Sequence, residues 1–212
     1  MKNMTDITVL LDRTGSMVTI KSETVSGLNE FIKTQKLGEG DAVMTLVQFD
    51  SQDPYEVKYT AVPIQNVKEM TMDEFEPRAM TPLHDAIGRM ITTVGSRLSN
   101  LSEDDRPDKI VMVILTDGYE NASKEYTGEK IKEMIAHQRE KYNWEFVFIG
   151  AGVDAVTMGT ALGIDPNLTI NAASANVDVA YAMTSEKINT YRSKYGTAAS
   201  LAYSDKERSA LA

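Results

Sequence analysis

The chain has 212 residues, of which 42% are hydrophobic and 25% are charged, a balance typical of a globular domain with its own core. Its formal charge of −9 argues against binding to nucleic acid or to an anionic membrane, because both need a basic face. The lack of cysteine excludes disulfides, thiolate metal sites and cysteine nucleophiles.

Apolar, β-branched runs alternate with helical patterns along the chain, as in α/β folds with a largely parallel sheet. In chain order we expect a strand at 7–11, a helix at 18–35, strands at 42–49 and 56–62, a helix at 85–98, a strand at 109–115, a helix at 128–142, a strand at 145–149, a helix at 155–162, a strand at 168–170 and a helix at 177–193. Only a short turn separates the second and third strands, which predicts a hairpin and an antiparallel edge. The predicted fold is therefore α/β, with a doubly wound, mostly parallel sheet and helices on both faces.

We expect residues 1–195, including the helix at 177–193, to form a single domain. Small and charged residues from 196 to 212 predict a weakly ordered tail. Gly27 interrupts the helix at 18–35, and we expect close packing against a neighbouring element there. No apolar stretch approaches the roughly 20 residues of a membrane span, and the first residues lack the apolar segment of a signal peptide, so we expect a cytoplasmic protein without a membrane partner.

Oxygen ligands gather where predicted strands end. Asp12, Thr14 and Ser16 follow the first strand, Asp117 follows the strand at 109–115, and Thr81 precedes the helix at 85–98. Because ligands of parallel α/β sheets bind at the carboxyl edge, we expect these three segments to converge. Two carboxylates and three hydroxyls, with no nitrogen or sulfur, suit Mg²⁺, Mn²⁺ or Ca²⁺ better than zinc or copper.

Each segment also has a plainer interpretation when it is taken alone. Ser16 precedes a helix and suits an N-cap, Thr81 suits a cap ahead of Pro82, and Asp117 with Gly118 suits a turn at the end of a strand. The occurrence of all three in the order that one site requires favours the site.

The pattern Asp12-x-Thr14-x-Ser16, with Thr81 and Asp117, resembles the metal-ion-dependent adhesion site of von Willebrand factor A domains. The usual first motif of that family is Asp-x-Ser-x-Ser, and Thr14 keeps the middle hydroxyl. The resemblance covers roughly residues 5–171. It implies a cation, Mg²⁺ first and Mn²⁺ or Ca²⁺ next, held by the three hydroxyls, with Asp12 and Asp117 acting directly or through water.

The resemblance also implies a protein partner that supplies an Asp or Glu carboxylate to the metal. Compact bacterial and phage members of the family often work beside AAA-type ATPases or in stress and defence systems, so a partner of that class is implied. We expect six residues around the site to tune the choice of partner: Arg13, Met80, His84, Tyr119, Glu120 and Asn121.

Two enzymatic interpretations compete with a metal-dependent binding module. A metal-dependent phosphohydrolase would use the same edge, but a nucleophilic Asp12 would need a second Asp where Thr14 stands. Residues 150–155 fit the dinucleotide pattern G-x-G-x-x-G/A, yet they come late in the chain and no acidic residue ends the next strand. We interpret them as a tight turn with Asp154 as a helix cap, and we expect no enzymatic activity.

Overall fold

A six-stranded mixed sheet forms the centre of the computed structural model, which describes residues 3–211. The strands are β1 (Met4–Asp12), β2 (Asp41–Phe49), β3 (Glu56–Pro63), β4 (Lys109–Thr116), β5 (Trp144–Ala151) and β6 (Thr169–Ala172). They lie in the order β3-β2-β1-β4-β5-β6, with β3 antiparallel to β2 and the other neighbours parallel. The predicted sheet with one antiparallel edge strand is confirmed.

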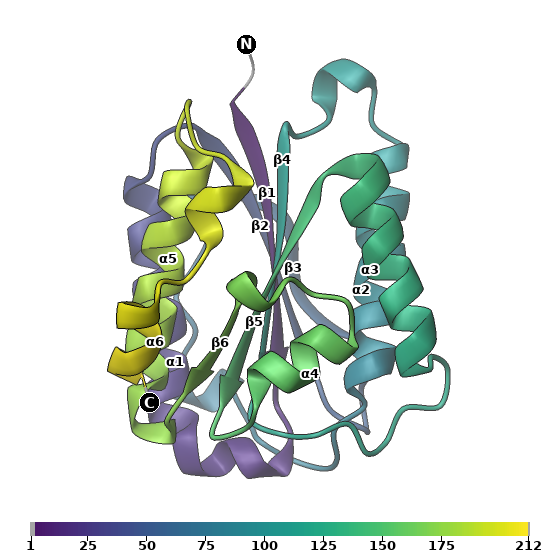
Figure 1. Ribbon diagram of the computed structural model, residues 1–212, viewed down its shortest axis with the longest axis vertical. Helices are drawn as coiled ribbons and strands as arrows, with labels where there is room; N and C mark the ends of the chain where they lie inside the picture. Colours follow the sequence, from purple (N-terminus) through teal and green to yellow (C-terminus); the bar gives the residue numbers. More distant parts are fainter. Residues whose placement is uncertain (1–2, 212) are drawn as a thin grey trace.

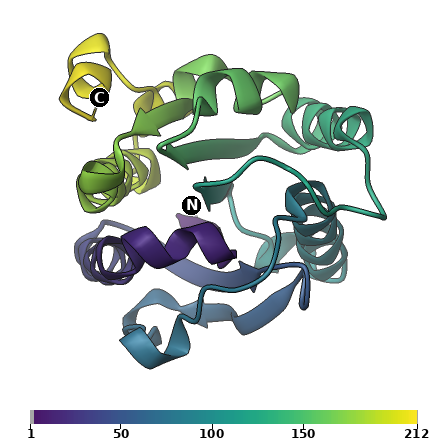
Figure 2. The same cartoon turned by 90° about the horizontal axis from the view of Figure 1, so that it is seen from below.

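Helices cover both faces of this sheet (Figures 1 and 2). The α-helices are α1 (Lys21–Leu37), α2 (Leu83–Ser99), α3 (Gly128–Tyr142), α4 (Ala155–Ala161), α5 (Val177–Arg192) and α6 (Asp205–Leu211). The 3-10 helices are η1 (Gly15–Ile20), η2 (Ile64–Asn66), η3 (Met72–Glu74), η4 (Glu103–Asp105), η5 (Pro166–Leu168), η6 (Ser174–Asn176) and η7 (Ala198–Leu201). On one face lie α1, α5 and α6, and on the other lie α2, α3 and α4, which confirms the doubly wound architecture.

Alternate residues of the central strands supply the two cores. In β1, Val9 and Leu11 pack on the α1 and α5 side, whereas Leu10 packs on the α2 and α3 side. Both faces of β1 and β4 are buried, as expected for parallel strands between two helical layers. A Cβ atom at Gly27 would lie 2.6 Å from Cδ2 of Tyr181, so α1 and α5 approach closely and the packing expected at Gly27 is confirmed.

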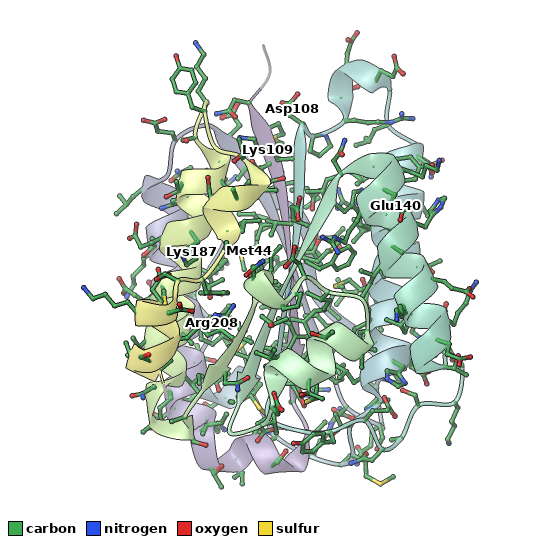
Figure 3. All side chains as sticks on the ribbon, viewed as in Figure 1. Met44, Asp108, Lys109, Glu140, Lys187 and Arg208 are labelled. Atoms are coloured by element: carbon green, nitrogen blue, oxygen red, sulfur yellow. The ribbon has the colours of Figure 1, made fainter. Side chains whose placement is uncertain are left out.

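The C-terminal segment packs onto the domain through η7 and α6. Leu201, Tyr203 and Leu211 are buried in the core on the α1 and α5 side. Figure 3 labels Lys187 and Arg208, and the Arg208 guanidinium donates a 2.7 Å hydrogen bond to the Thr169 carbonyl of β6. This arrangement differs from the weakly ordered tail predicted from sequence, because the three large apolar side chains among these small and charged residues are buried in the core.

Parallel strands bring their carboxyl ends to one edge of the sheet. Figure 1 shows the start of β1 at the top and η1, which follows β1, at the bottom. Asp108 and Lys109, at the amino end of β4, lie at the opposite end of the molecule from η1 (Figure 3).

Within residues 3–211, no helix is long and apolar enough to span a membrane.

Candidate metal centre

Asp12 is a fully buried carboxylate at the end of β1. Its Oδ1 accepts a 2.7 Å hydrogen bond from the backbone N–H of Thr14, and its Oδ2 accepts a 2.5 Å hydrogen bond from the hydroxyl of Thr116. Burial raises the pKa of Asp12 from its ordinary 3.8 to about 7, although these hydrogen bonds oppose the shift. The nearby charge of Asp117 raises this pKa further. The fold thus fixes this carboxyl group in place, but its hydrogen bonds stabilise the charged form less than burial destabilises it.

The loop after β4 meets the loop after β1 through two polar contacts. The exposed hydroxyl of Ser16 donates a 2.6 Å hydrogen bond to Oδ1 of Asp117, and it lies 3.3 Å from the hydroxyl oxygen of the buried Thr14. Burial also raises the pKa of Asp117. Residues 101 positions apart in the chain are therefore in direct contact.

Thr81 reaches the same place from the segment that leads into α2. Asn121 holds its backbone from both sides: the Thr81 N–H donates to Oδ1 of Asn121 at 2.8 Å, and the Asn121 N–H donates to the Thr81 carbonyl at 3.0 Å. A Cβ atom at position 118 would lie 2.9 Å from Oγ1 of Thr81, so Gly118 leaves room for this hydroxyl beside Asp117. Within residues 3–211 that hydroxyl makes no hydrogen bond.

The five residues predicted from the sequence therefore lie on three loops at the carboxyl edge. Among the described residues, no group of three or more His, Cys, Asp or Glu is placed to hold a metal ion. The cluster offers two carboxylates and three hydroxyls instead. This all-oxygen donor set suits a hard cation that keeps some of its waters, and a cation would favour the charged forms of both carboxyl groups.

Thr116 is a site residue that the sequence interpretation missed. Besides donating to Asp12, its hydroxyl oxygen accepts a 3.1 Å hydrogen bond from the Gly118 N–H. The signal for it was a hydroxyl residue closing an otherwise apolar strand, directly before Asp117.

Three of the expected rim residues have their polar side chains engaged in contacts within the protein. Arg13 is only 4% exposed and pairs with Asp50, so it does not face a partner. Glu120 accepts hydrogen bonds from the backbone N–H groups of its own loop and of His84, and Asn121 holds Thr81. The prediction that Arg13 tunes partner choice from the surface is wrong, because a guanidinium beside a buried carboxylate is drawn inward.

Two other expected rim residues do face solvent. Met80 is 56% exposed and Tyr119 is 60% exposed, and they are adjacent in sequence to Thr81 and Gly118. Val18, two residues after Ser16, is 62% exposed. Each of the three loops therefore carries one large exposed apolar side chain.

The segment with the dinucleotide-like pattern forms a tight turn between β5 and α4. A Cβ atom at Gly150 would lie 2.6 Å from Cβ of Ala155, so the glycine lets the turn fold back on itself. Oδ1 of Asp154 accepts a 3.0 Å hydrogen bond from the Thr157 N–H, which confirms the predicted helix cap.

Neither the models of protein families nor the curated proteins give a match to this sequence. Similar solved structures include a von Willebrand factor type A protein from Catenulispora acidiphila, with 13% identity, a TM-score of 0.63 and coverage of 89% of this chain and 43% of that chain. Another is proximal thread matrix protein 1 from the mussel byssus, with a zinc-occupied metal-ion-dependent adhesion site (MIDAS) motif. It has 14% identity and a TM-score of 0.60, and the match covers 87% of this chain and 48% of that chain. A third is manganese-loaded TRAP protein of Plasmodium vivax, with 14% identity, a TM-score of 0.56 and coverage of 86% of this chain and 75% of that chain.

These similarities establish the fold. The chain has the fold of a von Willebrand factor A domain, as the resemblance of its motifs implied. It spans less than half the length of the first two proteins, so their remaining segments have no counterpart in this comparison.

Proposed function

We propose that this chain is a protein-binding module that holds a divalent cation at the carboxyl edge of its sheet and captures an acidic residue of a partner through that cation. The observation that carries the proposal is the convergence of Asp12, Ser16, Asp117 and Thr81 from three distant loops. The 2.6 Å hydrogen bond from Ser16 to Asp117 and the placement of the Thr81 hydroxyl beside Gly118 define it.

In this proposal the hydroxyls of Thr14, Ser16 and Thr81 hold the cation, while Asp12 and Asp117 balance its charge directly or through water. Neutral hydroxyl ligands leave much of the positive charge available for the carboxylate of a partner. Mg²⁺ is the cation that we propose, with Mn²⁺ or Ca²⁺ as substitutes. A zinc-occupied MIDAS motif in one protein of the same fold and the manganese loading of another support a divalent cation here.

The rim of the site suggests the character of the partner. Val18, Met80 and Tyr119 supply exposed apolar surface on the three loops. We expect the captured Asp or Glu to be flanked by apolar residues, because such contacts around a charged centre exclude water from it. The family resemblance implies an AAA-type ATPase or a stress or defence component as the first partner class to test.

The second candidate, a metal-dependent phosphohydrolase, receives less support from the geometry. Both carboxylate oxygens of Asp12 already accept hydrogen bonds from Thr14 and Thr116, which favours a fixed ligand over an attacking nucleophile. The position two residues after Asp12 holds the hydroxyl of Thr14, whose pKa is far too high for a general acid.

Thermal unfolding with and without metal tests the proposed function. Mg²⁺ or Mn²⁺ should raise the melting temperature of the wild type, because a ligand that binds only the folded state stabilises it. Asp12→Ala should lose this shift, and Thr81→Ala, which removes one hydroxyl ligand of three, should reduce it. Asp154→Ala, which alters the loop after β5 at the same edge, should keep it. If the wild type shows no metal-dependent shift and calorimetry detects no binding, the metal site is refuted.

Partner capture tests the binding role itself. A pull-down from the native host should lose its partner in EDTA and with Thr81→Ala, and should keep it with Asp154→Ala. Capture that survives both EDTA and Thr81→Ala places the partner on another surface. Phosphatase turnover with Mg²⁺ or Mn²⁺ that Asp12→Asn abolishes would favour the hydrolase instead.

A further inference from the structure

The segment that carries Thr81 has no regular structure of its own. We refer to residues 76–82, between η3 and α2, as the Thr81 loop. Three backbone hydrogen bonds fasten it to the ends of β1 and β2: Arg78 N–H to the Arg13 carbonyl at 2.9 Å, Gly15 N–H to the Ala79 carbonyl at 3.1 Å, and Ser51 N–H to the Met80 carbonyl at 2.9 Å. The loop therefore depends on its neighbours for its shape.

This loop also contains a strained residue. Ala79 has a φ of +60°, in the left-handed region that residues with a Cβ atom rarely adopt. Such a conformation costs on the order of 1 kcal/mol and persists only where the surroundings enforce it. Something beyond local preference therefore keeps the Thr81 loop in its present form.

An ion cluster around the buried Asp50 lies beside the loop and contacts it through Arg78. Asp50 is fully buried just after β2, and its Oδ2 accepts from Arg13 at 2.6 and 3.0 Å and from Nε of Arg78 at 2.9 Å. Its Oδ1 accepts from two backbone N–H groups of the following turn. These partners hold the pKa of Asp50 below its usual range despite its burial. Arg78 thus binds Asp50 with its side chain and Arg13 with its backbone.

We propose that Arg78 and Asp50 are positioning residues of the metal site, which hold the strained Thr81 loop so that the Thr81 hydroxyl stands ready beside Asp117. The inference rests on the proposed function and deepens it. Replacing a group that orients metal ligands from outside the coordination sphere typically weakens metal affinity about tenfold or more. A loop that is already held in its bound conformation loses less conformational entropy when the cation binds.

Arg78 offers the sharper test because it is 39% exposed and its loss leaves the Arg13–Asp50 pair intact. We expect Arg78→Gln to weaken Mn²⁺ binding about tenfold, measured by the electron paramagnetic resonance of free Mn²⁺. Arg78→Lys keeps the charge and should restore part of the affinity. Arg139→Gln is the matched control, because Arg139 is 35% exposed and pairs with Asp165 away from the site. The control should bind Mn²⁺ as the wild type does.

A double-mutant cycle separates positioning from a general effect on the fold. If Arg78 acts through Thr81, the double variant Arg78→Gln/Thr81→Ala should bind Mn²⁺ no more weakly than Thr81→Ala alone. Additive losses in the double variant would overturn the inference, and so would wild-type affinity in Arg78→Gln. Those two results leave the proposed function standing, because the wild type still binds the metal. A wild type that binds no Mn²⁺ overturns the proposed function and this inference with it.

Discussion

The raised pKa of Asp12 predicts how the metal-free protein responds to pH. The folded state holds the carboxyl proton up to about pH 7, whereas the unfolded chain releases it near 3.8. The folded state therefore binds this proton more tightly, so the free energy of unfolding falls as the pH rises from about 4 to about 7. A gap of about three pH units corresponds to a loss of about 4 kcal/mol, of which about 2 kcal/mol falls between about pH 5 and pH 7.

Substituting Asp12→Asn removes this titration while keeping a side chain of similar shape. We expect the variant to gain about 2 kcal/mol relative to the wild type between about pH 5 and pH 7. The side-chain amide changes the contacts with Thr14 and Thr116 by an amount that does not depend on pH. The pH-dependent part of the difference in unfolding free energy between the variant and the wild type therefore reports the Asp12 carboxyl group alone.

Urea unfolding in EDTA measures this difference. Trp144 is the single tryptophan of the chain and is buried at the start of β5, so its fluorescence reports unfolding of the core. With saturating Mg²⁺ the pH dependence of the wild type should become shallower, because the cation favours the charged carboxylate. A stability difference that stays constant across this pH range would refute the assignment of an abnormally raised pKa to Asp12.

Three further perturbations have defined outcomes. Thr116→Val removes the hydrogen bond to Asp12 and should lower Mn²⁺ affinity about tenfold, measured by the electron paramagnetic resonance of free Mn²⁺. Thr92→Val, which removes a hydroxyl bonded only within α2, is the control, and unchanged affinity in Thr116→Val would show that the bond to Asp12 does not support the site. Gly27→Ala places a Cβ atom 2.6 Å from the Tyr181 ring and should cost about 1–3 kcal/mol in urea unfolding without changing metal affinity, and wild-type stability would contradict the close packing of α1 on α5. Ending the chain at residue 195 removes three buried side chains and should cost about 5 kcal/mol, so a truncated protein as stable as the full chain would restore the prediction of a weakly ordered tail.

The order of elements was predictable because each strand and helix carries its own local pattern. The five candidate ligands were predictable for a similar reason, since Asp12, Thr14 and Ser16 stand within one turn and the others directly flank a strand or a helix. Their meeting followed from one topological rule, that parallel strands end at a common edge.

The contacts that support the site were not predictable in this way. The bond from Thr116 to Asp12 joins residues 104 positions apart, and the bonds from Arg13 to Asp50 join residues 37 apart. Neither pair shares a period or a motif, so only the register of β1 against β2 and β4 reveals them. The core positions of Leu201, Tyr203 and Leu211 escaped prediction because they lie in a short segment of small and charged residues that shows no clear helical or strand period.

The contrast between Asp12 and Asp50 supports the proposed cation site. Both carboxylates are fully buried within one residue of the end of adjacent parallel strands. Asp50 receives two guanidinium groups and its pKa is lowered, whereas Asp12 receives a hydroxyl and an amide and its pKa is raised. Within residues 3–211, no Lys, Arg or His forms an ion pair with Asp12 or Asp117. A buried carboxylate without a cationic partner reduces stability. A divalent cation bound beside Asp12, Asp117 and the Thr81 hydroxyl would offset this destabilisation.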